Sequence, residues 1–131
     1  MIAAAELVRL AATRVRDAEV LFRAKRYDGA YYICGYAVEL ALKARICKTL
    51  KWPGFPESNS EFRDYQSFKT HTLPVLLHLS GRETKIKGTH LTEWSVVAAW
   101  TPDLRYRIAG TATAHDTQVM IRAARAILKH L

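Results

Sequence analysis

Residues 27–44 read YDGAYYICGYAVELALKA, and between Ala30 and Leu42 the only charged residue is Glu39. This pattern is typical of a helix that is buried on nearly every side, because a helix at a protein surface keeps one polar face. A carboxylate inside such a helix requires a partner, since burying an unpaired charge is costly. The stretch therefore predicts a central, buried helix that carries one paired acidic side chain.

Three basic residues are candidate partners for Glu39. Arg105 belongs to a segment that joins two predicted core helices, and Arg14 falls inside the apolar arc of the first helix. Lys43 follows Glu39 by four residues and can pair with it along the same helix. Two interpretations of the arginines stay open. One is a structural ion pair or network of Glu39 with Arg105 or Arg14, and the other is a nucleotide or phosphate pocket lined by Glu39 and Arg105.

Helical periodicity recurs along the rest of the chain, without convincing strand alternation. Asp28 is the expected N-cap of the central helix, and Thr113 with Asp116 resembles a capping box at the start of the last helix. The basic segment 82–88 is expected to be a linker. The predicted helices span about residues 3–24, 29–50, 72–80, 91–100 and 113–131. We therefore expect an all-α fold, an antiparallel helical bundle of four to five helices, as a single domain over residues 1–131.

The sequence is strongly basic, with a formal net charge of +8 at pH 7 and a pI near 9.8. Such a balance favours a polyanionic partner, either a nucleic acid or an acidic protein. No apolar run reaches the roughly 18 residues of a membrane-spanning helix, and no signal peptide is evident. We therefore expect no membrane association and a cytoplasmic location. Cys34 and Cys47 have neither disulfide nor metal-ligand spacing and are expected to be inert, reduced thiols.

Several segments resemble the HEPN family of small helical proteins. The most specific is the core of the central helix, Gly35–Ala44. The others are Tyr27-x-x-Ala30-Tyr31, Thr70-His71-x-Leu73 and Trp100-x-Pro102-x-x-Arg105-Tyr106. The resemblance implies a compact, mostly antiparallel helical bundle that commonly pairs as a homodimer. It also implies one of two roles, because many members cut RNA without a metal and others are partners of small nucleotidyltransferases.

The ribonuclease motif of this family is an arginine and a histidine separated by four to six residues, near the start of the last helix. The imidazole exchanges a proton with the RNA 2′-hydroxyl or the leaving oxygen, while the guanidinium steadies the phosphate. Arg105 has no histidine at that distance, because residues 110–112 are Gly, Thr and Ala. His115 lies ten residues after Arg105 and eight after Arg107. A catalytic pair of Arg105 or Arg107 with His115 is therefore an alternative that the spacing does not predict.

These observations lead to three functional hypotheses. The first is a non-catalytic or divergent HEPN-like protein that binds RNA, a nucleotide or a nucleotidyltransferase partner. The family resemblance implies that it acts in a toxin–antitoxin or defence setting. Its ligand-binding residues are expected to be Glu39, Lys43, Arg105, Tyr106 and Arg107. The second hypothesis is a metal-independent endoribonuclease toxin, and the third is a pure protein-interaction module. None of them requires a metal or a cofactor, and the chain has no glycine-rich phosphate loop and no CxxC or HExxH motif.

Overall fold

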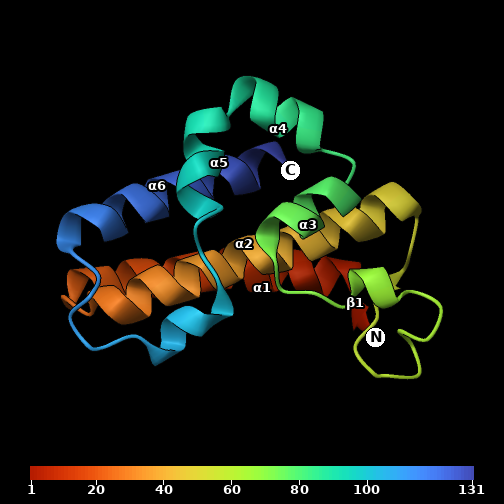
Figure 1. Cartoon of the computed structure of the whole chain (residues 1–131), viewed down its shortest axis with the longest axis horizontal. Coiled ribbons are helices and arrows are strands. Elements are labelled where there is room, and N and C mark those ends of the chain that lie inside the picture. The colour runs from red at the N-terminus through yellow and green to blue at the C-terminus, as the bar shows by residue number, and fades with distance from the viewer.

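The computed structural model describes residues 1–131, and most of the chain is helical (Figure 1). The α-helices are α1 (Ala4–Arg23), α2 (Tyr27–Leu50), α3 (Leu73–Leu79), α4 (Glu83–Thr89), α5 (Leu91–Val97) and α6 (Ala114–His130). Two 3-10 turns, η1 (Gln66–Phe68) and η2 (Pro102–Tyr106), lie in the connections, and a short ladder pairs β1 (Ile2–Ala3) with β2 (Gly54–Phe55). The prediction of an all-α fold is confirmed. None of the helices combines the length and the apolar character that crossing a bilayer requires.

Two elements differ from the expectation. The segment expected to be a linker forms most of α4, because Ile86 is fully buried and Lys87 Nζ pairs with Glu83 Oε2 at 3.2 Å, one turn away. The β1–β2 ladder was not expected, since two residues are too few to show an alternating pattern. The bundle therefore has six helices, of which α3, α4 and α5 are seven residues long.

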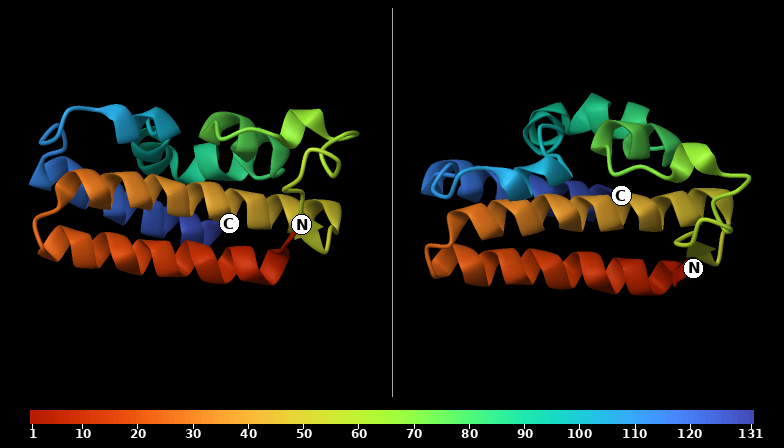
Figure 2. Two further views of the ribbon diagram at one scale, coloured as in Figure 1. Left: turned by 90° about the horizontal axis from the view of Figure 1, so that it is seen from below. Right: turned by 60° about the horizontal axis from the view of Figure 1, so that its bottom comes forward.

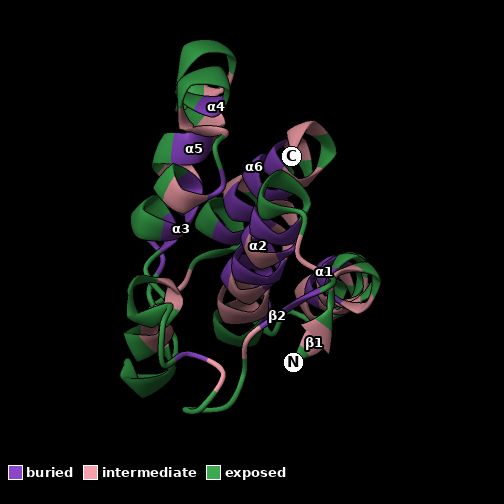
Figure 3. Cartoon of the chain, turned by 90° about the vertical axis from the view of Figure 1, so that its right-hand side faces the viewer, coloured by how far each residue is buried: buried purple, intermediate pink, exposed green.

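α1 and α2 run antiparallel along the length of the molecule (Figure 2). α1 buries a single stripe, at Leu7, Ala11, Val15 and Ala18, whereas α2 buries residues around its whole circumference. Viewed along the long axis, α2 lies between α1 on one side and α3, α4 and α5 on the other (Figure 3). α6 packs on α2, α5 and α1. The central, buried helix predicted from residues 27–44 is therefore confirmed.

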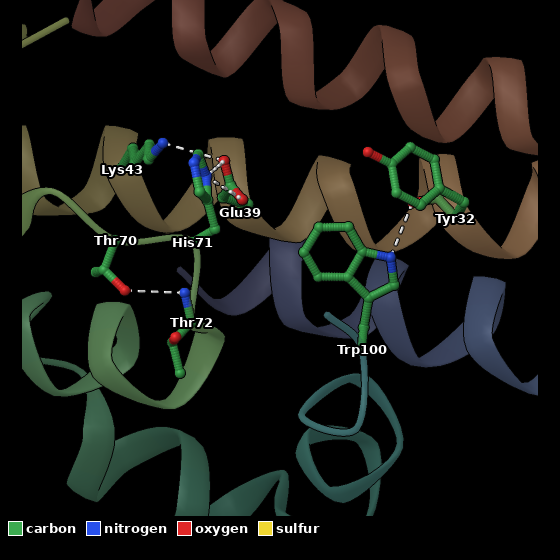
Figure 4. A network of polar contacts seen from close by, with 7 residues as sticks. All are labelled: Tyr32, Glu39, Lys43, Thr70, His71, Thr72 and Trp100. Atoms are coloured by element: carbon green, nitrogen blue, oxygen red, sulfur yellow. Dashed lines mark hydrogen bonds and ion pairs between the residues drawn. The ribbon is translucent and has the colours of Figure 1, made fainter. Parts of the chain in front are cut away.

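A tryptophan lies across the middle of α2. Trp100 follows α5, is 1% exposed, and donates its indole Nε1–H to the Tyr32 carbonyl oxygen at 3.0 Å (Figure 4). Its ring occupies the space that a Cβ atom on Gly35 would need. Gly35 is therefore required for packing, because only a residue without a side chain lets the ring approach the helix backbone.

The two cysteines have the properties expected of inert thiols. Both are free and buried, and the Cys34 thiol lies 3.7 Å from the Met120 carbonyl oxygen. Burial raises the pKa of Cys34 to about 12 and also raises the pKa of Cys47. Because the thiolate is the reactive form, neither side chain is suited to nucleophilic or metal chemistry at neutral pH.

Candidate functional site

A cavity of about 550 Å³ opens between the N-terminal end of α2, α5, η2 and the start of α6. Its apolar lining includes side chains of α5 and Leu104 of η2. Its polar lining comes from separate parts of the chain: Asp28, Tyr31, Ser95, Arg105, Arg107, Thr111, His115 and Asp116. The cavity therefore brings together three residues singled out from the sequence, namely Arg105, Arg107 and His115.

Both arginines of the cavity are exposed, and neither forms an ion pair with a carboxylate. The Arg105 guanidinium lies 4.9 Å from the ring centre of Tyr106. Hydrogen bonding to Tyr106, and then to Tyr32, raises the pKa of Arg105 above its ordinary value. Burial raises the pKa of Tyr31, and the nearby charge of Arg107 opposes that shift. Guanidinium groups without an acidic partner are available to bind phosphate.

His115 lies in the first turn of α6, where Thr113 caps the helix. The Thr113 hydroxyl accepts the Asp116 backbone N–H at 3.0 Å, so the predicted cap is confirmed. His115 is exposed and lines the cavity beside Asp116. The connection between η2 and α6 therefore places His115 in the same cavity as Arg105 and Arg107, which the sequence spacing alone does not predict. No group of three or more His, Cys, Asp and Glu side chains is placed to hold a metal ion.

Asp28 holds the loop that leads from η2 to α6. Its carboxylate accepts the backbone N–H of Gly110 at 2.6 Å and of Ala112 at 2.8 Å. These two hydrogen bonds, that of Ala112 first, lower the pKa of Asp28. The predicted N-cap role was wrong, because α2 already begins at Tyr27 and no side chain caps it. Since the partners of Asp28 are more than 80 residues away in sequence, no local pattern reveals this role.

Replacing Asp28 with asparagine should loosen this loop. The neutral amide is a weaker acceptor than the carboxylate, so amide hydrogen exchange at Gly110 and Ala112 is expected to accelerate at pH 7. Asp103→Asn, at an exposed aspartate of η2, is the matched control. Because the pKa of Asp28 is lowered on folding, its stabilisation is present above the unfolded pKa and is lost as pH falls through the folded pKa. Equal rates of amide hydrogen exchange at Gly110 and Ala112 in the wild type and in Asp28→Asn would rule out that Asp28 holds this loop.

The predicted ion pair of Glu39 with Arg105 is not formed. Glu39 is 2% exposed, as expected of a buried carboxylate, but its partners are Lys43 and His71 (Figure 4). Lys43 Nζ lies 3.0 Å from Glu39 Oε2, and His71 Nδ1 lies 3.1 Å from both carboxylate oxygens. Of the partners considered from the sequence, Lys43 is correct. Arg14 pairs instead with Asp17, Nη1 to Oδ2 2.7 Å.

The geometry of α2 explains why Arg105 does not reach Glu39. The Arg105 side chain hydrogen-bonds to Tyr32, and Tyr32 precedes Glu39 by seven residues on α2. Seven residues of α-helix correspond to about 10 Å along the axis, beyond the reach of a direct ion pair. The place next to Glu39 is taken by residues 70–72, where the Thr72 N–H donates to Thr70 Oγ1 at 3.1 Å. Glu39 and Lys43 therefore form a structural network with His71, apart from the residues that line the cavity.

The fold and the cavity define a small helical domain that presents two unpaired arginines and a histidine at one end. The family model for the HEPN domain matches residues 4–54, which span α1, α2 and the start of β2. This match confirms the HEPN resemblance inferred from the central helix. Arg105, Arg107 and His115 lie outside the matched segment. No curated protein and no solved structure gives a significant match to the chain.

Proposed function

We propose that this HEPN-type chain binds the phosphate groups of RNA or of a nucleotide in the cavity between α2 and α6. One observation carries the proposal: Arg105 and Arg107 line the same cavity and have no acidic partner. The net charge of +8 supports it, because a positive potential attracts polyanions to the surface. In this proposal the chain is a non-catalytic or divergent member of the family.

The proposed ligand set is Arg105, Tyr106 and Arg107. Tyr106 is 76% exposed beside Arg105, and an exposed aromatic ring next to a guanidinium suits stacking of a base whose phosphate the arginine binds. Glu39 and Lys43, which were also expected to bind ligand, pair with each other, and Glu39 also contacts His71. We therefore assign them to the stability of the fold.

Fluorescence anisotropy with a labelled single-stranded RNA tests this proposal. The double substitution Arg105→Ala/Arg107→Ala should raise the dissociation constant at least about tenfold, because it removes charge-assisted hydrogen bonds to phosphate. The matched control, Arg16→Ala/Arg63→Ala, removes the same charge from exposed positions outside the cavity and should have a much smaller effect. Equal losses in the two variants would mean that the basic surface, and not the cavity, binds RNA.

A metal-independent endoribonuclease is the second candidate, because the cavity also contains His115. In that reaction the imidazole moves the proton of the 2′-hydroxyl or of the leaving oxygen, and Arg105 or Arg107 steadies the phosphate. Cleavage of RNA in the presence of a chelator, lost in His115→Ala, is the result that this candidate requires. RNA binding without cleavage under those conditions would leave phosphate binding as the function.

An exposed apolar residue next to the cavity supports the proposal of a homodimer. Ile108 is 86% exposed, and a large apolar side chain at such exposure favours a protein partner. Two copies that meet there would place their cavities side by side. We expect Ile108→Asp to shift the protein toward the monomer in sedimentation experiments, whereas Val75→Asp, at an exposed position of α3, should not. A monomeric wild type at high concentration would contradict the dimer.

The HEPN match also motivates the proposal that the chain acts beside a small nucleotidyltransferase in a toxin–antitoxin or defence setting. Co-expression with a nucleotidyltransferase encoded next to it, followed by purification under stringent salt, tests this partnership. Recovery of a stoichiometric complex is the expected result. Independent elution of the two proteins would contradict it.

A further inference from the structure

A second concave surface, the α1/α6 groove, lies on a different part of the molecule from the cavity. It has a volume of about 590 Å³ and is lined by residues of α1, α2 and the C-terminal end of α6. The first half of α1 contributes four alanines and Val8, and α6 and the residue after it contribute Leu128 and Leu131. Val8 is 59% exposed although it lies on this apolar surface. The groove is therefore an apolar surface that the chain itself leaves uncovered.

The groove lies where α1, α2 and the C-terminal end of α6 meet, and both α1 and α6 pack on α2. Arg125 of α6 forms an ion pair with Glu19 in the second half of α1, so the two helices are joined there. The groove residues of α6 follow Arg125 by about one turn, and those of α1 belong to its first half, on the N-terminal side of Glu19. At the groove, the small alanine side chains of α1 would let another helix approach closely.

The charges around the groove indicate which kind of helix fits. Arg45, Lys48 and Lys129 line it, and none of them forms an ion pair with an acidic side chain; the partly buried Arg45 guanidinium donates to the Leu131 carbonyl oxygen at 3.2 Å, whereas Lys48 is exposed. No acidic residue lines the groove. A symmetric pairing of two copies through this surface would bring these cations against each other, which electrostatic repulsion disfavours. The groove is therefore complementary to an acidic partner and not to itself.

We propose that the α1/α6 groove binds an amphipathic helix of a partner protein, with apolar anchors on one face and acidic residues on both flanks. The apolar face packs against Val8, Leu128 and the alanines of α1. The acidic flanks pair with Lys48 on one side and with Lys129 on the other. The part of α1 that lines the groove, Ala4 to Ala12, is about 12 Å long, which corresponds to two to three turns of the bound helix.

A designed helical peptide with leucines at i, i+3, i+7 and i+10 and flanking glutamates is the probe. The control peptide has the same leucines with glutamine in place of glutamate. Anisotropy titrations with the labelled peptides should give binding of the acidic peptide that weakens as salt increases, and at least about tenfold weaker binding of the control. Failure of the acidic peptide to bind, or equal binding of the two peptides, would overturn the proposal.

Substitutions in the protein test whether the acidic peptide binds at the α1/α6 groove. Val8→Asp and Lys48→Glu/Lys129→Glu should each weaken binding of the acidic peptide at least about tenfold. Their matched controls are Val20→Asp, at a valine of α1 with 56% exposure, and Lys51→Glu/Lys85→Glu, at two exposed lysines outside the groove. Unchanged affinity in the groove variants would overturn the assignment to this surface. A dimer that Val8→Asp dissociates would overturn it in favour of self-association.

Discussion

Gly35→Ala is expected to lower the free energy of unfolding by about 3 kcal/mol, because the added methyl group overlaps the ring of Trp100. Neither partner has room to move. Trp100 is 1% exposed and is tied to the Tyr32 carbonyl oxygen, and Gly35 lies in the middle of the most buried helix. Chemical denaturation followed by circular dichroism measures the loss. Gly29→Ala is the matched control, because a Cβ there meets only Leu21 at an ordinary contact distance of 3.6 Å.

A double-mutant cycle separates this clash from a general effect of alanine. In a Trp100→Ala background the ring is gone, so adding Gly35→Ala should cost much less than it does in the wild type. The expected coupling is more than about 1 kcal/mol, with the sign of a relieved clash. Additive losses would show that Trp100 does not set the requirement for glycine at position 35.

Lys43→Met should have the second large effect, about 3 kcal/mol of stability at pH 7. The substitution removes the ammonium next to the Glu39 carboxylate, which is 2% exposed, and leaves only the hydrogen bond with His71. Because methionine keeps the length of the side chain and removes only its charge, the loss of stability reports the effect of the missing charge. Lys48→Met, at an exposed position five residues further along α2, is the control and should change stability by less than about 0.5 kcal/mol.

If Lys43→Met is destabilising because it leaves a buried charge without compensation, removing that charge as well should restore stability. Glu39→Leu/Lys43→Met removes both members of the pair and should recover most of the stability that Lys43→Met loses, because no uncompensated charge stays buried. His71→Ala should cost less than Lys43→Met, since the His71 side chain is 67% exposed and its interaction is screened by water. If the double substitution is less stable than Lys43→Met, the network contributes more than charge compensation.

The sequence was sufficient to predict the fold class and the central, buried helix. The apolar run around Glu39 predicts burial on all sides, and α2 has that property. It also showed that Glu39 needs a partner, and the helical spacing made Lys43 one of three candidates, of which Arg105 and Arg14 were wrong. His71 was missed as the second partner because it comes from the connection before α3, and no periodic pattern relates positions 32 residues apart.

The cavity could be predicted only in part. Arg105, Arg107 and His115 were recognised by residue type, but their spacing gave no reason to expect a common site. What brings them together is the path of the chain from η2 to α6, and that path depends on two hydrogen bonds of Asp28 to backbone groups at positions 110 and 112. Backbone groups carry no sequence signature, so the role of Asp28 emerges only from the structure.

Titration of the ¹⁵N-labelled protein with a short single-stranded RNA, followed by amide chemical shifts, tests the phosphate-binding proposal most directly. The largest shifts should fall on residues 105–116 and on Asp28 and Tyr31, which surround the cavity. Residues of the α1/α6 groove should stay unchanged. Shifts spread evenly over the basic surface, or concentrated away from Arg105 and Arg107, would contradict the assignment of the cavity as the phosphate site.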